Sequence, residues 1–133
     1  MELMRKVMLL NITNHPSNKW SEEQMNAALS LALDVIDISF PNVDPKLSTD
    51  EVYKMADDLV ENLRNKYSTN NICCLVQGDF TLTVALIFCL NYHEIPVYAA
   101  TSERSTVDND DGSKTSVFNF VQFRNYIYKP TNG

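Results

Sequence analysis

Apolar and polar positions alternate along the chain in blocks that predict a repeated strand–helix pattern. Short runs of residues that are apolar at nearly every position are typical of parallel strands covered on both faces. Between them lie longer segments in which apolar residues recur with helical spacing. The pattern predicts strands at 7–12, 35–40, 72–76 and 95–100, and helices at 21–33, 48–64 and 80–92.

The start of each predicted helix carries a capping signal. Ser21 is followed three residues later by Gln24, and Ser48 is followed three residues later by Glu51, which is the spacing of a capping box. Asp79 is a candidate N-cap for the third helix. That third helix is apolar on almost every side, so we expect it to be buried.

The pattern changes after residue 101. Residues 103–107 and 116–128 alternate like strands, and the polar segment 108–114 between them predicts a hairpin. The alternation puts Phe118 and Phe120 on one face of the last strand and Phe123 on the other. This strand is long for so small a domain, so we expect one end to reach past the sheet into a partner subunit.

These elements predict an α/β, Rossmann-like three-layer fold in one domain, residues 1–133. A β-α-β-α-β-α-β core over 1–101 requires right-handed crossovers and a parallel sheet, for which we expect the strand order 2-1-3-4. The C-terminal antiparallel hairpin, residues 102–130, is then added beyond the fourth strand.

Composition narrows the classes of function. Of the 133 residues, 44% are hydrophobic and 21% charged, an ordinary globular balance, and the net charge is −6. A protein that wraps duplex DNA would normally carry a basic face, so that partner is disfavoured. We also expect no membrane partner, because no apolar run approaches the length of a spanning helix, and we expect a cytoplasmic protein.

Cysteine usage agrees with a reducing compartment. Cys73, Cys74 and Cys89 are odd in number, lack Cys-x-x-Cys spacing and lie in apolar segments. We expect them to be buried thiols, with no metal site and no cofactor.

The expected topology indicates where a ligand would bind. Open α/β sheets bind ligands beside the carboxyl ends of the strands, where the strand order reverses, here between the first and third strands. The loop after the first strand is rich in polar groups, and Gly78 with the following helix start would favour an anion. Arg104 follows the fourth strand and could add a cation. The candidate ligand-binding residues are Asn14, Ser17, Lys19, Gln77, Gly78, Asp79, Thr81, Ser102 and Arg104.

Each candidate also has a purely structural explanation. Asn14 and Ser17 can bond to the local backbone, and His15 can simply pack in its loop. Arg104 can form an ion pair at the sheet edge. Asp79 counts against a phosphate on the helix terminus unless its carboxylate is used for capping.

Together, several segments resemble a group of small stand-alone CRISPR-associated proteins of the Csx type, which are similar in fold to CRISPR-associated Rossmann-like (CARF) sensor domains. The resemblance covers nearly the whole chain. The segments that carry it are Asn11-Ile12-Thr13-Asn14-His15-Pro16-Ser17, Trp20-Ser21, the Gly78 turn, Thr101-Ser102-Glu103-Arg104, and the closing run from Phe118 to Tyr126.

The resemblance implies a homodimer that binds a cyclic oligoadenylate of type III CRISPR immunity, with cyclic tetra-adenylate as the first ring size to test. Some relatives are ring nucleases, which cut this messenger without a metal by attack of a ribose 2′-hydroxyl on the adjacent phosphorus. His15 is then the candidate catalytic residue, because histidine side chains exchange protons near neutral pH.

Two other functions stay open. The chain could be a sponge or regulator that holds the messenger without cutting it, since Asp79 and the single nearby lysine depart from the common sensor pattern. More distantly, a flavodoxin-like domain would use the same switch point for a mononucleotide such as FMN. It would be expected to carry a Ser/Thr-rich phosphate loop after the first strand, which this chain lacks.

Overall fold

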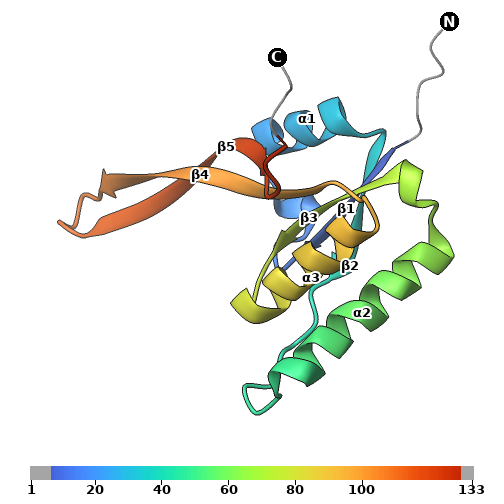
Figure 1. Ribbon diagram of the computed structural model, residues 1–133. Helices are drawn as coiled ribbons and strands as arrows, with labels where there is room; N and C mark the ends of the chain where they lie inside the picture. The colour runs from blue at the N-terminus through green and yellow to red at the C-terminus, as the bar shows by residue number, and fades with distance from the viewer. Residues whose placement is uncertain (1–6, 130–133) are drawn as a thin grey trace, which may run out of the picture.

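A five-stranded mixed sheet forms the centre of the computed structural model, with helices on both of its faces (Figure 1). The structure describes residues 7–129, so residues 1–6 and 130–133 of the expected domain and hairpin lie outside the described residues. The strands are β1 (Met8–Thr13), β2 (Asp34–Ser39), β3 (Ile72–Gln77), β4 (Val97–Asp108) and β5 (Lys114–Asn125), and the helices are α1 (Glu22–Leu31), α2 (Thr49–Lys66) and α3 (Phe80–Tyr92), with short 3-10 turns at Ser17–Lys19 and Thr69–Asn71.

Strands β1 to β4 form the parallel part of the sheet. β1 lies between β2 and β3, and its Asn11 is in register with Asp37 on one side and Leu75 on the other. β1 and β3 are buried along nearly their whole length, as their continuous apolar runs predict. The α/β class is therefore confirmed.

The complete strand order is β2-β1-β3-β4-β5. It differs from the expected four-strand order 2-1-3-4 because the fifth strand belongs to the same continuous sheet. Residues 95–100 and 103–107, expected as two strands, are joined in the single strand β4. β4 pairs in parallel with β3 only at Val97 and Tyr98 and then runs outward, paired with β5 alone.

The two faces of the sheet are covered by different helices. α2 and α3 pack together on one face, over the larger apolar core that contains Leu10, Ile12 and Leu86. α1 covers the opposite face, where a smaller core contains Leu9 and Ala28. Figure 1 shows α1 on one side of the strands and α2 with α3 on the other. Among residues 7–129, every helix is too short or too polar to cross a membrane.

The predicted helix caps are present. The Ser21 hydroxyl accepts the backbone N–H of Gln24, and Ser48 and Glu51 form a complete capping box at the start of α2. The Asp79 carboxylate accepts the N–H of Leu82 and so caps α3. These starts were predictable because each cap depends only on residues within one helical turn.

Because of a β-bulge, the side chains of β5 do not alternate between the two faces as expected for the last strand. Ala100 pairs with Phe123 but Ser102 pairs with Phe120, so two residues of β5 lie opposite Thr101 alone. The Thr101 hydroxyl accepts the N–H of Gln122 and donates to its carbonyl. As a result the Phe123 ring lies against Phe120, with ring centroids 5.0 Å apart, instead of on the other face.

The expectation that α3 is buried all round is wrong for its outer side. Its inner residues, such as Leu86 and Leu90, are fully buried. The outer side chains of Phe80, Phe88 and Tyr92 are exposed, because only α2 lies beside α3 on this face of the sheet.

Candidate functional site

A groove lies between the β1–α1 loop and the base of the β4–β5 hairpin, on the α1 side of the sheet. It consists of two adjoining cavities of about 780 and 230 Å³. The two cavities share five lining residues, and we call their combined space the hairpin groove. The shared residues are His15, Trp20, Gln24, Phe118 and Phe120.

A buried hydrogen-bond network holds the β1–α1 loop in place. Asn11 is fully buried in β1, and its side-chain amide donates to the carbonyl of His15 and to the carboxylate of Asp37, each at 2.9 Å. The amide oxygen of Asn11 accepts the hydroxyl of Thr13 at 2.8 Å, and Thr13 in turn accepts the N–H of His15. The amide nitrogen and the amide oxygen of the buried Asn11 side chain are therefore both hydrogen-bonded, as burial requires.

Asp37 connects the same loop to β2. Besides Asn11, it accepts the backbone N–H and the hydroxyl of Ser17, the latter at 3.0 Å. Burial alone would raise the pKa of Asp37, but the bonds from Asn11 and Ser17 outweigh it and lower the pKa below the ordinary value of 3.8. The charged form of this carboxylate thus stabilises the loop.

Aromatic side chains form one wall of the hairpin groove. The Trp20 indole N–H donates to the His15 carbonyl at 3.1 Å, which fixes the ring beside the loop. Its ring centroid lies 6.4 Å from that of Phe123, which in turn packs on Phe120. Phe118 lies further out along β5 and is 67% exposed. The groove therefore offers aromatic surface on which a flat ring could stack.

Polar groups reach the groove from the β1–α1 loop and from α1. The side chains of Asn14, His15 and Lys19 are exposed, and neither the His15 imidazole nor the Lys19 amine bonds to another residue within 7–129. Lys19 is the one permanently charged cation among the lining residues, and Glu23 is the one carboxylate. The backbone of this loop is thus held firmly while its functional groups remain available.

Gln77 and Ser102 line the inner, smaller cavity. The Gln77 side-chain amide bonds to both the N–H and the carbonyl of Ala100, at 3.0 and 3.2 Å. It thereby bridges β3 and β4 where the two strands begin to separate. Ser102 follows on β4 and faces the same cavity as His15.

The structure assigns Gly78 a packing role. A Cβ at this position would overlap the ring of Phe40, which fills the space above the turn. The absence of a side chain therefore makes room for Phe40, whereas the sequence suggested room for a ligand. Phe40 packs against the larger core, on the face opposite the groove.

Four other predicted residues lie outside the groove. Asp79 and Thr81 line a separate hollow of about 290 Å³ against the loop before α2. Ser17 is engaged with Asp37. Arg104 lies on the outer hairpin, where its guanidinium donates to the Ser116 hydroxyl at 2.9 Å. Of the ten predicted site residues, the structure thus brings Asn14, His15, Lys19, Gln77 and Ser102 to one groove.

Sequence reasoning missed several residues of this site. Asn11 was part of a run described as apolar, although a lone amide within a buried strand was a usable signal. Trp20, Phe118 and Phe120 were recognised only as parts of the segments that carry the resemblance, and none of them as a ligand-binding residue. No local pattern could bring these aromatic residues together, because Trp20 and Phe118 are far apart in the chain.

The residues described here give no support for a metal centre. Within 7–129, no group of three or more His, Cys, Asp or Glu side chains is placed to hold a metal ion. Cys73 and Cys74 are buried and Cys89 is half-buried, and all three are free thiols. Burial raises the pKa of Cys73 to about 11, so this thiol stays protonated and unreactive at neutral pH.

Fold and groove together define an α/β protein with a mixed sheet and an open, partly aromatic groove at the carboxyl ends of its parallel strands. Residues 7–124 match the Uncharacterized protein MJ1673 family, so the chain belongs to that family. No curated protein and no solved structure matches the chain.

Proposed function

We propose that the chain binds a cyclic oligoadenylate in the hairpin groove and cuts it as a metal-independent ring nuclease. The observation that carries the proposal is the combination, in one groove, of exposed aromatic rings with His15, Asn14 and Lys19. Proteins that bind single-stranded nucleotides use this combination, because bases stack on aromatic side chains while polar and cationic groups contact the backbone. The larger cavity of the groove, about 780 Å³, lies within the range of small-ligand sites.

The polar residues have distinct expected roles. Lys19 would form a charge-assisted bond with a phosphate, and Phe118 and Trp20 would stack against adenine. Asn14 and Gln24 would bond to base or ribose. The β1–α1 loop is already held by Asn11 and Asp37, so binding would cost little ordering of the backbone.

The proposed reaction is a transesterification. The ribose 2′-oxygen attacks the adjacent phosphorus, the bond from phosphorus to the 5′-oxygen breaks, and the products are a 2′,3′-cyclic phosphate and a 5′-hydroxyl. His15 would take the proton from the 2′-hydroxyl, and water or the resulting imidazolium would supply a proton to the leaving oxygen. Holding the attacking oxygen in line contributes the rest of the acceleration.

Each groove holds one lysine, whereas a cyclic oligoadenylate carries a negative charge on every phosphate. We therefore propose that two copies bind one ring, with their grooves facing across a two-fold axis. The β4–β5 hairpin supports this arrangement because it projects beyond the parallel sheet (Figure 1), with Phe118 exposed where β5 borders the groove.

The decisive experiment is to incubate the protein with cyclic tetra-adenylate and cyclic hexa-adenylate in EDTA and to resolve the products by chromatography. Linear products ending in a 2′,3′-cyclic phosphate support the enzyme. Tight binding with the ring left intact would make the chain a sponge or regulator. Failure to bind either ring would contradict both functions.

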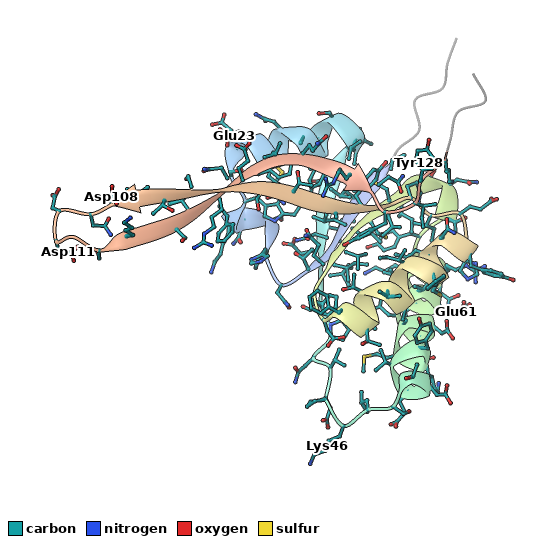
Figure 2. All side chains as sticks on the ribbon, turned by 60° about the vertical axis from the view of Figure 1, so that its left-hand side comes forward. Glu23, Lys46, Glu61, Asp108, Asp111 and Tyr128 are labelled. Carbon is teal, nitrogen blue, oxygen red and sulfur yellow. The ribbon has the colours of Figure 1, made fainter. Side chains whose placement is uncertain are left out.

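Variants then assign the roles. His15→Ala should bind normally but cut about a hundred-fold to ten-thousand-fold more slowly, the usual effect of losing a general acid or base. Lys19→Ala should weaken binding by on the order of 1.5–3 kcal/mol. The matched controls are His93→Gln, which lies outside the groove, and Lys46→Ala on the loop before α2 (Figure 2). Both controls should behave like wild type.

Arg104 provides a separate test of the outer hairpin. Because its guanidinium is bonded to Ser116 and does not line the groove of a single copy, Arg104→Ala should affect binding only if a second copy or a large ring reaches it. An effect as large as that of Lys19→Ala would indicate that the ligand extends along the hairpin.

A further inference from the structure

The outer side of α3 carries a stripe of exposed apolar side chains. Phe80 is 89% exposed, Val84 45%, Phe88 65% and Tyr92 81%. These residues follow one another at intervals of four, so each is the surface neighbour of the next and together they form one continuous row along the helix. We call Phe80, Val84, Phe88 and Tyr92 the α3 stripe.

The stripe is large for a surface that faces water. A fully buried aromatic side chain removes about 150–250 Å² from solvent, so these four side chains expose on the order of 500 Å². This is toward the upper end of the largest apolar patch of a typical monomer, about 300–600 Å². A stable interface buries about 800 Å² on each partner, so the stripe is large enough to form the apolar centre of one.

The chemistry of α3 suits contact with an identical surface. No residue of Phe80–Tyr92 is charged, although the chain as a whole has a net charge of −6. Two copies can therefore bring the α3 stripe together without a charged side chain of α3 itself in the contact, and the nearest carboxylates, Asp57 and Asp79, lie at its border. A hollow of about 280 Å³ beside the stripe offers space for an aromatic side chain of the other copy. Besides Phe88 and Tyr92 it is lined by Tyr53, Asp57, Ala85, Cys89 and His93, so its rim also offers polar groups, which suit the hydroxyl of a tyrosine.

We propose that the α3 stripe is an interface between two copies of this chain. A two-fold axis across the helix would place Phe80 opposite the other copy's Tyr92 at the ends, and the small Val84 opposite the large Phe88 near the centre. An axis along the helix would place each residue opposite its own copy. Both arrangements are isologous and bury the same stripe.

This interface is independent of the proposed function. α3 lies on the sheet face opposite α1 and the hairpin groove, so the stripe lines neither cavity of the groove. A chain that uses both the hairpin and the α3 stripe would form a tetramer, and one that uses the stripe alone would form a dimer. In either case, removing the stripe should halve the mass of the assembly.

The test is sedimentation equilibrium of the full chain at about 100 μM, comparing wild type with Val84→Asp and with the double variant Phe80→Ser/Phe88→Ser. Circular dichroism and thermal melting verify that each variant folds. We expect both variants to lose half of the wild-type mass, while the control Leu33→Asp, an exposed leucine after α1, keeps it. A monomeric wild type, or folded variants of unchanged mass, would overturn the proposal.

Cross-linking provides the second measurement. In a Cys89→Ser background the remaining cysteines, Cys73 and Cys74, are buried. Val84→Cys should form a disulfide with itself on oxidation by diamide if the axis runs along α3. A mixture of Phe80→Cys and Tyr92→Cys should form the mixed disulfide if the axis runs across it. The absence of both products at 100 μM would contradict the contact, and cyclic oligoadenylate binding need not change in any of these variants.

Discussion

Alternate residues of β1 face two different environments. Leu10 and Ile12 point into the larger apolar core under α2 and α3. Asn11, between them, is equally buried but points to the opposite face, where it bonds to His15 and Asp37. One side of the strand thus faces the larger apolar core. On the other side, beyond Leu9 of the smaller core, Asn11 and Thr13 form what we call the polar face, which positions the β1–α1 loop.

The difference shows how a small domain separates stability from a binding site. Apolar burial is favourable wherever the residues fit, whereas a buried amide is tolerated only when its bonding groups are paired. The polar face meets this condition through bonds to the loop, so the same contacts that satisfy Asn11 also position His15. Four predictions test this division, in order of decreasing expected effect.

The largest effect should come from the apolar face. Leu86 is fully buried in α3 against the sheet, so Leu86→Ala removes packing and leaves a cavity. We expect a loss of about 2–5 kcal/mol in the free energy of unfolding, measured by urea denaturation. Leu33→Ala, at a position that is 56% exposed, is the control and should change stability by no more than about 0.5 kcal/mol. If Leu86→Ala lowered the free energy of unfolding by less than Leu33→Ala does, the assignment of this face as the main core would be wrong.

A substitution on the polar face should cost less stability and should also loosen the β1–α1 loop. Asn11→Ala removes one hydrogen-bond donor from the carboxylate of Asp37 and one from the carbonyl of His15. We expect a loss of about 1–3 kcal/mol, together with faster amide hydrogen exchange at Ser17, whose N–H bonds to Asp37. Asn14→Ala, at an exposed position in the same loop, should change neither quantity. Unchanged exchange in Asn11→Ala would show that the network does not hold the loop.

The turn at Gly78 tests the packing role of this residue. Gly78→Ala should cost about 1–3 kcal/mol, because the new Cβ must displace the Phe40 ring. In a Phe40→Ala background the same change should be nearly neutral, so the two substitutions should show a clear coupling energy in a double-mutant cycle. Additive effects would mean that the glycine serves some purpose other than making room for Phe40.

The smallest effect should be a pH dependence from Asp37. Because the pKa of Asp37 is lower in the folded chain, its contribution to stability is fully present above its ordinary value of 3.8 and is lost as the pH falls below it, through the folded pKa. The contribution should be less than about 1 kcal/mol, since an exposed carboxylate is screened by solvent. Between pH 6 and pH 3, the free energy of unfolding measured by urea denaturation should decrease less for Asp37→Asn than for wild type. Asp110→Asn, in the hairpin turn, is the control.

Local features of the sequence were enough to predict much of the framework. Ser21, Ser48 and Asp79 each cap a helix through a bond within one turn, so their positions could be identified without tertiary information. The strands at β1 and β3 were equally clear because both of their faces are covered and their apolar runs are continuous. The loop after β1 was therefore recognised as part of a candidate site.

Contacts between distant residues decided the rest. The β-bulge at Thr101, where β4 pairs with β5, turns the Phe123 side chain to the other face of the sheet. The ring of Phe40, nearly forty positions before Gly78 in the chain, occupies the space that a side chain at Gly78 would need. Trp20 and Phe118 share a groove only because the hairpin folds back beside the β1–α1 loop. Local propensity could identify α3 as apolar, but only the packing of α2 and the sheet determined which of its sides is buried and which is exposed. Burial depends on what the rest of the chain brings to each surface, and a periodic pattern in one segment does not contain that information.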